Sequence, residues 1–171
     1  NTVLAHYTND QVTFSQVDKK KDADTWLRKE LISIQADIVY LDAPLSLPAA
    51  YYNNGDSYHY READKLTRAM SPMFLGGLTA RAMSLKHALK PLTFHEIYPA
   101  FFQSEIVQSI HYKVDIHLFI AELHHKERFV LAQQPQNWHQ VDALIALLIG
   151  TRHQKNRHQE IGNPAEGIII I

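Results

Sequence analysis

Residues 40–48 read Tyr-Leu-Asp-Ala-Pro-Leu-Ser-Leu-Pro, and this stretch decides the fold prediction. It places one acidic residue, Asp42, directly after the apolar run 38–41, and it is interrupted by Pro44 and Pro48. A short apolar run bounded by proline is typical of a buried strand. Because ligands and catalytic groups gather at strand ends of open α/β sheets, Asp42 is a candidate site residue. The alternative is a turn residue that bonds its own backbone.

Two further acidic residues, Glu96 and Asp142, stand in similar surroundings. Glu96 interrupts the aromatic-rich run 94–98, where glutamate is unfavourable, so we expect it to face inward and to be paired or metal-bound. Asp142 lies beside the apolar stripe of a predicted helix, where an ionised carboxylate is costly unless paired or coordinated. It could equally be an acid favoured near a helix N-terminus, with His139 on the same face. Together the three carboxylates predict a divalent-metal site.

Composition limits the class of protein. A chain of 171 residues with 46% hydrophobic content predicts a single domain, residues 1–171. The absence of cysteine excludes disulfides, thiolate zinc sites and cysteine nucleophiles, and it fits a reducing compartment. The formal net charge of -1 means that any nucleic-acid contact must be local. No apolar run reaches the roughly 20 residues that span a bilayer, so we expect a cytoplasmic protein with no membrane partner.

Hydrophobic periodicity predicts an α/β domain with a mixed sheet flanked by helices. We expect strands at residues 2–7, 12–17, 38–41, 94–98 and 168–171. Helices are expected after Asp22 or Asp24, at 60–70, 78–89, 100–110 and 114–127, and from an N-cap at Asn137 to Gly150. The first two strands should form an antiparallel hairpin. Residues 49–57 read as a polar loop, so that about 49–90 form an inserted loop and helical segment.

The chain resembles the predicted nucleases of the ribonuclease H fold, a family of unknown function. The resemblance covers roughly residues 38–171 and rests on the order and spacing of several segments. These are Asp-Ala-Pro-Leu after the strand at 38–41, Tyr-Arg-Glu-Ala-Asp at 60–64, Gly-Leu-Thr-Ala-Arg-Ala-Met-Ser-Leu at 77–85, Glu-Ile-Tyr-Pro at 96–99, Val-Asp-Ala-Leu-Ile-Ala-Leu at 141–147 and Glu-Gly-Ile-Ile-Ile-Ile at 166–171.

The resemblance implies a nuclease that hydrolyses phosphodiester bonds of nucleic acid. By resemblance, Asp42, Glu96 and Asp142 are the catalytic residues and bind two Mg²⁺ or Mn²⁺ ions, hard cations that prefer oxygen ligands. The substrate-binding residues implied near them are Arg61, Asp64 and Arg81. Arginine there could bind phosphate oxygens in bidentate fashion. For Asp64, a helix-surface ion pair with the arginine four residues later is the alternative interpretation.

One part of the family pattern has no counterpart in the sequence. By resemblance, an opening strand with a Gly-Ile-Asp type motif contributes a further aspartate to the metal site. We expect such a strand upstream of Asn1, paired with the strand at 2–7, because the hairpin otherwise lacks a neighbour in the sheet. Without that central strand a ribonuclease H-like sheet should not be stable. The alternative is that this protein lacks the strand.

Two other functions remain open. The first is a non-catalytic nucleic-acid-binding or interaction module on the same fold. The second is a small-molecule phosphoryl-transfer enzyme, since the same broad architecture supports sugar kinases and ATPases. A nucleotide binder should show a glycine-rich phosphate loop, and only Gly76-Gly77 is available. The eleven histidines lack the metal-binding pair with a central glutamate, so we interpret them as solvated rather than as zinc ligands.

Overall fold

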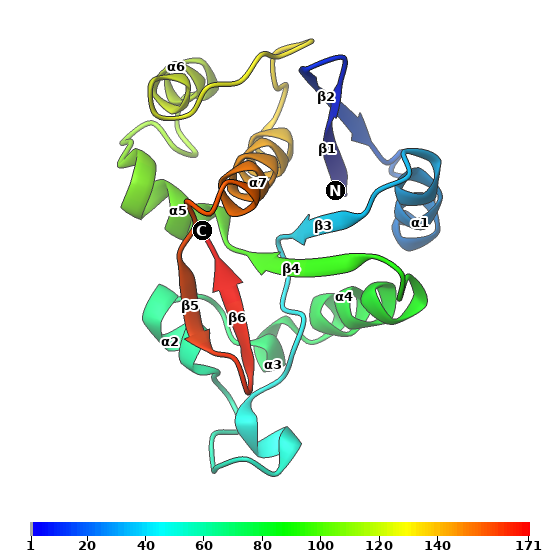
Figure 1. Cartoon of the computed structure of the whole chain (residues 1–171), viewed down its shortest axis with the longest axis vertical. Coiled ribbons are helices and arrows are strands. Elements are labelled where there is room, and N and C mark those ends of the chain that lie inside the picture. The colour runs from blue at the N-terminus through cyan, green and yellow to red at the C-terminus, as the bar shows by residue number, and fades with distance from the viewer. Residues whose placement is uncertain (1) are drawn as a thin grey trace.

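The computed structural model describes residues 2–171, which form two sheets surrounded by helices (Figure 1). The strands are β1 (Val3–Thr8), β2 (Gln11–Gln16), β3 (Ile38–Leu41), β4 (Thr93–Ile97), β5 (Glu160–Asn163) and β6 (Gly167–Ile170). The α-helices are α1 (Ala23–Ser33), α2 (Glu62–Thr67), α3 (Pro72–Leu75), α4 (Gly77–Ala88), α5 (Pro99–Phe102), α6 (Ile116–Lys126) and α7 (Trp138–Gln154). A 3-10 turn, η1 (Ala49–Tyr52), and a π-type turn, η2 (Gln103–Val107), complete the order.

The two sheets differ in strand direction. Strands β1 and β2 form an antiparallel hairpin, closed by a two-residue turn in which Asn9 and Asp10 both have positive φ. The larger sheet has the order β3-β4-β6-β5, in which β3, β4 and β6 are parallel and β5 is antiparallel to β6. The predicted α/β architecture, a mixed sheet flanked by helices, is therefore confirmed.

Side chains of the larger sheet alternate between two apolar cores. Val39 and Phe94 pack with α1 and α4, whereas Tyr40 and Ile97 pack with the core around α7. This alternation follows from the two-residue period of a strand. Both faces of the sheet are covered, as parallel strands require. In Figure 1, α7 and α1 stand on opposite sides of the β1-β2 hairpin.

Most predicted elements are confirmed, with changed boundaries. Asp22 is the N-cap of α1 and Asn137 that of α7, each accepting a hydrogen bond from a backbone amide of the first turn. The helix predicted at 60–70 is shorter, because Arg68 takes the left-handed conformation that ends α2. The helix predicted at 100–110 is wrong beyond the π-type turn, because Gln108 is also left-handed.

Three elements escaped prediction because their own sequences carry too weak a signal. Strand β5 is too polar to read as a strand alone, and it forms by pairing with the apolar β6. Its Gly162 has φ 109°, and a Cβ there would lie 2.6 Å from the Cβ of Ala63 in α2. Helix α3 and the turn η1 are too short to produce a periodic pattern.

Among residues 2–171, no helix combines the length and apolar character that crossing a membrane requires.

The packing of α7 on β3 depends on one glycine. A Cβ at Gly150 would lie 2.5 Å from the ring of Tyr40. That ring has little freedom to move, because Tyr40 Oη bonds His153 Nδ1 at 2.8 Å and the ring stacks on His95. Glycine at this position therefore permits the close approach of helix and strand.

We expect Gly150→Ala to lower the free energy of unfolding by about 1–2 kcal/mol, because overpacking outweighs the gain in helix propensity. Chemical denaturation of both proteins measures the difference. Gly77→Ala is the matched control, since nothing lies within 4 Å of a Cβ at Gly77 in α4. It should be neutral or stabilising by up to about 1 kcal/mol. Equal stability of Gly150→Ala and the natural protein would contradict the proposed packing.

Candidate functional site

A groove of about 410 Å³ lies between the hairpin and the larger sheet. Strands β1 and β3 line it together with residues of α1, α4 and α7. Two of the predicted carboxylates, Asp42 and Asp142, both line this groove, and so do His139 and Arg81. The fold thus brings the acidic residue after β3 to the same groove as the acidic residue on α7.

Asp42 has fewer contacts that offset its negative charge than Asp142 has. Among residues 2–171, no donor forms a hydrogen bond with its carboxyl group, and water reaches the side chain through the open groove. The groove walls nevertheless surround the group closely, and this desolvation raises the pKa of Asp42 to about 7. The negative charge of Asp142 raises this pKa further, Lys113 opposes the rise, and Glu96 adds a smaller one. Asp42 can therefore exchange a proton near neutral pH.

Asp142 is held by two donors from the segment before α6. The Tyr112 hydroxyl donates to Oδ1 at 2.7 Å, and Lys113 Nζ donates to Oδ2 at 2.5 Å. Burial and the charge of Asp142 both raise the pKa of Tyr112, so this hydroxyl stays protonated and keeps donating. Lys113 also lies over the rings of Tyr112 and Trp138. These contacts fix the orientation of Asp142 toward the groove.

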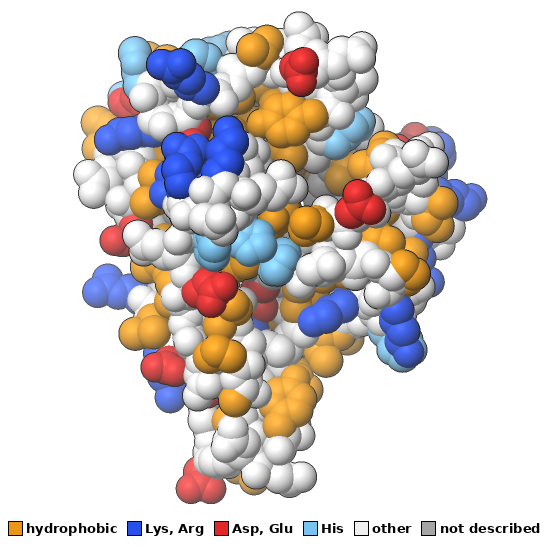
Figure 2. All heavy atoms as spheres, viewed as in Figure 1, with side chains coloured by type: hydrophobic (Ala, Val, Ile, Leu, Met, Phe, Trp, Pro, Cys, Tyr) orange, Lys and Arg blue, Asp and Glu red, His pale blue; other side chains and the backbone are white. Residues whose placement is uncertain are grey.

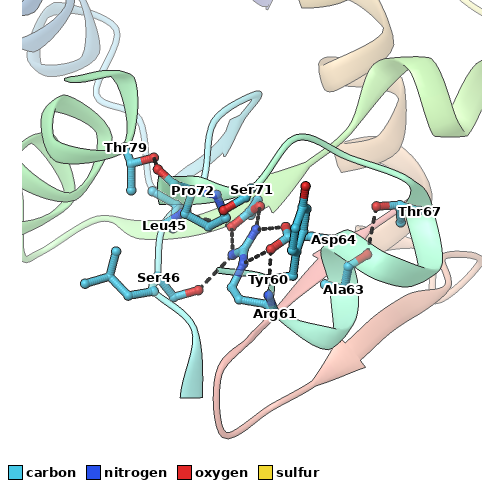
Figure 3. A network of polar contacts seen from close by, with 12 residues as sticks. Leu45, Ser46, Tyr60, Arg61, Ala63, Asp64, Thr67, Ser71, Pro72 and Thr79 are labelled. Atoms are coloured by element: carbon cyan, nitrogen blue, oxygen red, sulfur yellow. Dashed lines mark hydrogen bonds and ion pairs between the residues drawn. The ribbon is translucent and has the colours of Figure 1, made fainter. Parts of the chain in front are cut away.

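Glu96 instead belongs to a buried ion cluster with Arg61 and Asp64 (Figure 3). Arg61 Nη1 and Nη2 donate to the two oxygens of Glu96 at 2.7 and 2.6 Å. Arg61 Nη2 and Nε donate to the two oxygens of Asp64 at 2.6 and 3.2 Å. Arg61 Nη1 also donates to Ser46 Oγ at 2.8 Å, and the amide of Leu45 donates to Glu96 Oε2 at 2.8 Å.

The cluster provides a hydrogen-bond acceptor for every N–H group of the Arg61 guanidinium. Its five bonds match the five N–H groups of arginine, and Arg61 is 0% exposed. Burial alone would lower the pKa of Arg61, but its bonds to Glu96 and Asp64 outweigh this and the pKa is raised. Arg61 is therefore a permanent cation that joins α2, β4 and the segment after β3. A direct role of Arg61 and Asp64 in substrate binding stays a prediction, because every donor of Arg61 bonds to protein.

Arg81 differs from Arg61 in its exposure. It lines the groove and forms a bidentate pair with Asp24 of α1, in which Nη2 lies 2.8 Å from Oδ1. Both side chains are well exposed, at 50% and 37%. A pair in this setting is weak, so Arg81 can exchange its partner for a ligand in the groove.

Within residues 2–171, no group of three or more His, Cys, Asp or Glu side chains is arranged to hold a metal ion. The convergence of Asp42, Glu96 and Asp142 on metal therefore stays a prediction. Asp42 and Asp142 alone fit the requirement of Mg²⁺, which is commonly bound by one or two carboxylates, several waters and substrate phosphate.

A cluster of three histidines was not predicted from the sequence. The ring of His153 on α7 lies 4.5 Å from that of His95 on β4 and 4.4 Å from that of His158, between ring centroids. Figure 2 shows histidine side chains gathered near the middle of the viewed face. Burial and the neighbouring imidazoles lower the pKa of both His95 and His153. No sequence signal could reveal this cluster, because it joins residues on separate elements.

Comparison of the chain with models of protein families, with curated proteins and with solved structures finds no significant match. The class that the structure defines is thus a mixed α/β protein with a pair of carboxylates in a groove.

We expect Arg61→Ala to lower the free energy of unfolding by roughly 3–5 kcal/mol, because it leaves the carboxylates of Asp64 and Glu96 buried without their countercharge. Arg81→Ala is the control, since it removes an exposed ion pair and should change stability by less than about 1 kcal/mol. Urea denaturation monitored by tryptophan fluorescence measures both. Similar small losses in the two variants would show that the buried cluster does not stabilise the fold.

The raised pKa of Asp42 predicts a pH dependence of stability. Folding raises this pKa from 3.8 to about 7, so the associated stability is complete below about pH 4 and is lost as pH rises through about 7. In Asp42→Asn this loss is absent, so its melting temperature should fall less than that of the natural protein between pH 5 and pH 8. Every other titratable group is the same in the two proteins, and the comparison therefore isolates Asp42. Asp56→Asn, in an exposed loop, should keep the natural pH profile.

Proposed function

We propose that this protein is a divalent-metal-dependent nuclease of ribonuclease H-like architecture, in which Asp42 and Asp142 bind the cation. One observation carries the proposal: the two carboxylates share a groove, and their repulsion contributes to the raised pKa of Asp42. Two acids near each other in a partly desolvated setting are unfavourable unless a proton or a cation lies between them. A divalent cation would neutralise this pair.

The donor set favours Mg²⁺ or Mn²⁺ as that cation. Carboxylate oxygens suit hard divalent ions, and the described groove contains neither cysteine nor a histidine group arranged for zinc. Such an ion, when bound, activates water and stabilises the leaving oxygen of a phosphodiester. Glu96 stays a predicted further ligand, because both of its oxygens already accept hydrogen bonds from Arg61.

Other side chains around the groove suit a phosphate-bearing substrate. Lys113 bonds Asp142, and it would be released to a substrate phosphate once a cation neutralises that carboxylate. Arg81 and His139 line the same groove from α4 and α7. Lys113 and Arg81 thus supply local positive charge that the net charge of -1 does not.

The ribonuclease H-like assignment belongs to the same proposal. Support comes from the order of a hairpin followed by parallel strands, with Asp42 after β3 and Asp142 on a long helix that packs against the sheet.

The proposal predicts cleavage of nucleic acid that requires both groove carboxylates. We expect the protein with Mn²⁺ to cleave at least one of single-stranded, duplex and branched DNA or RNA. Asp42→Asn and Asp142→Asn should each reduce the rate by orders of magnitude, because each removes one anionic ligand while nearly preserving shape. Gel assays with end-labelled substrates measure the rates, and Asp56→Asn should retain the natural rate.

A second readout separates metal binding from catalysis. Mn²⁺ should raise the melting temperature of the natural protein at pH 8 and should do so less in Asp42→Asn. Cleavage that survives chelation or both substitutions would reject the metal mechanism. Binding of nucleic acid without cleavage would favour the non-catalytic module.

A further inference from the structure

We propose that Lys113 is an autoinhibitory residue of the carboxylate pair, because its ammonium group neutralises Asp142 until a divalent cation displaces it. This inference rests on the proposed function, and it adds a control on the entry of the cation. Lys113 lies in the short turn 111–115 that precedes α6, on a different element from either carboxylate.

The ammonium group of Lys113 acts on both groove carboxylates. Its Nζ lies 2.5 Å from Oδ2 of Asp142, which is the contact of a close, charge-assisted hydrogen bond. It also lowers the pKa of Asp42, against the burial and the Asp142 charge that raise this pKa. Lys113 therefore cancels one of the two negative charges that attract a divalent cation. A cation that enters the site has to compete with this ammonium group.

The backbone of Lys113 has a conformation that a residue with a side chain rarely adopts. Its φ is 63°, in the left-handed region, where the Cβ lies too close to the following carbonyl oxygen. Side-chain contacts offset this: Nζ lies 4.9 Å from the centre of the Tyr112 ring and 5.5 Å from that of Trp138. Backbone outliers of this kind cluster at functional sites and switch regions. The ion pair with Asp142 thus stabilises a turn whose own conformation is unfavourable.

The ion pair can open without a rearrangement of the fold. The Lys113 side chain is 45% exposed, so its ammonium group can move into water at modest cost. The Tyr112 hydroxyl donates to Oδ1 of Asp142, the oxygen that Lys113 does not contact, and it keeps the carboxylate oriented when Lys113 leaves. Two backbone amides of the turn donate to the His111 carbonyl, at 2.9 Å each, and hold the turn closed. Release of Lys113 is therefore a movement of one side chain.

Removal of the ammonium group should make the site bind a divalent cation more tightly. Lys113→Met keeps the apolar stem of the side chain, whereas Lys113→Arg keeps the charge. At pH 8, above the pKa of Asp42, we expect calorimetric titration to give a Kd for Mn²⁺ about tenfold lower in Lys113→Met than in the natural protein. Lys113→Arg should bind Mn²⁺ as the natural protein does. So should Lys126→Met, which removes an exposed charge at the end of α6.

A second measurement uses the natural protein alone. Saturating Mn²⁺ should release Lys113 and increase the rate at which acetic anhydride modifies its amine, measured by mass spectrometry of peptides. We expect an increase of about threefold or more, because an ammonium group that has lost its carboxylate partner gives up its proton more readily. Lys126 is the internal control, and its rate should not change.

The possible results distinguish this inference from the proposed function. Equal affinity of the natural protein and Lys113→Met for Mn²⁺, or unchanged acetylation of Lys113 in saturating Mn²⁺, would overturn the inference and leave the metal site standing. Binding of Mn²⁺ by neither protein would overturn both. Tighter binding in Lys113→Met, without cleavage of any nucleic acid, would support the inference and reject the nuclease.

Discussion

The buried guanidinium of Arg61 is the interaction on which the larger sheet and its site depend. Its bonds reach Asp64 on α2, Glu96 on β4 and Ser46 after β3, so one side chain ties three segments that are remote in sequence. A fully buried cation is tolerated only when its charge and its donors are all satisfied. The cluster also holds the chain directly after Asp42, because Glu96 accepts a hydrogen bond from the Leu45 amide. The position of the groove carboxylate is thereby coupled to the core of the fold.

This coupling divides the three predicted carboxylates into two kinds. Glu96 has its countercharge inside the protein, at 2.6 Å from Arg61. Asp142 accepts a hydrogen bond from Lys113, whereas no donor among residues 2–171 bonds to the carboxyl group of Asp42. A group without compensation in a desolvated groove is the one that gains most from a proton or a cation. The proposed chemistry therefore centres on Asp42 rather than on all three acids equally.

Sequence patterns predicted the parts of the fold that local physics determines. The turn at Asn9 and Asp10, the caps at Asp22 and Asn137 and the apolar runs of β3 and β6 all carry signals within a few residues. Strand β5 and the histidine cluster carry no such signal, because they form through contacts between remote segments. The same limit applied to Glu96. Its inward orientation was predictable from an acid in an apolar strand, but the identity of its partner, Arg61, required the tertiary structure.

The hairpin shows how the fold can persist while, among residues 2–171, the edges of β1 and β3 that line the groove pair with no other strand. It is attached chiefly through α7 rather than through the larger sheet: the Asn137 and Gln140 side chains donate to Gln16 of β2, and Tyr7 of β1 bonds Thr151. On the far edge, β2 makes a single bridge between Val12 and Leu131. Helix α7 therefore holds both walls of the groove, since it contacts β1 and, through Gly150, the Tyr40 ring of β3. A ligand that enters the groove, such as the proposed cation, therefore meets walls that the helix already positions, so binding does not have to order them.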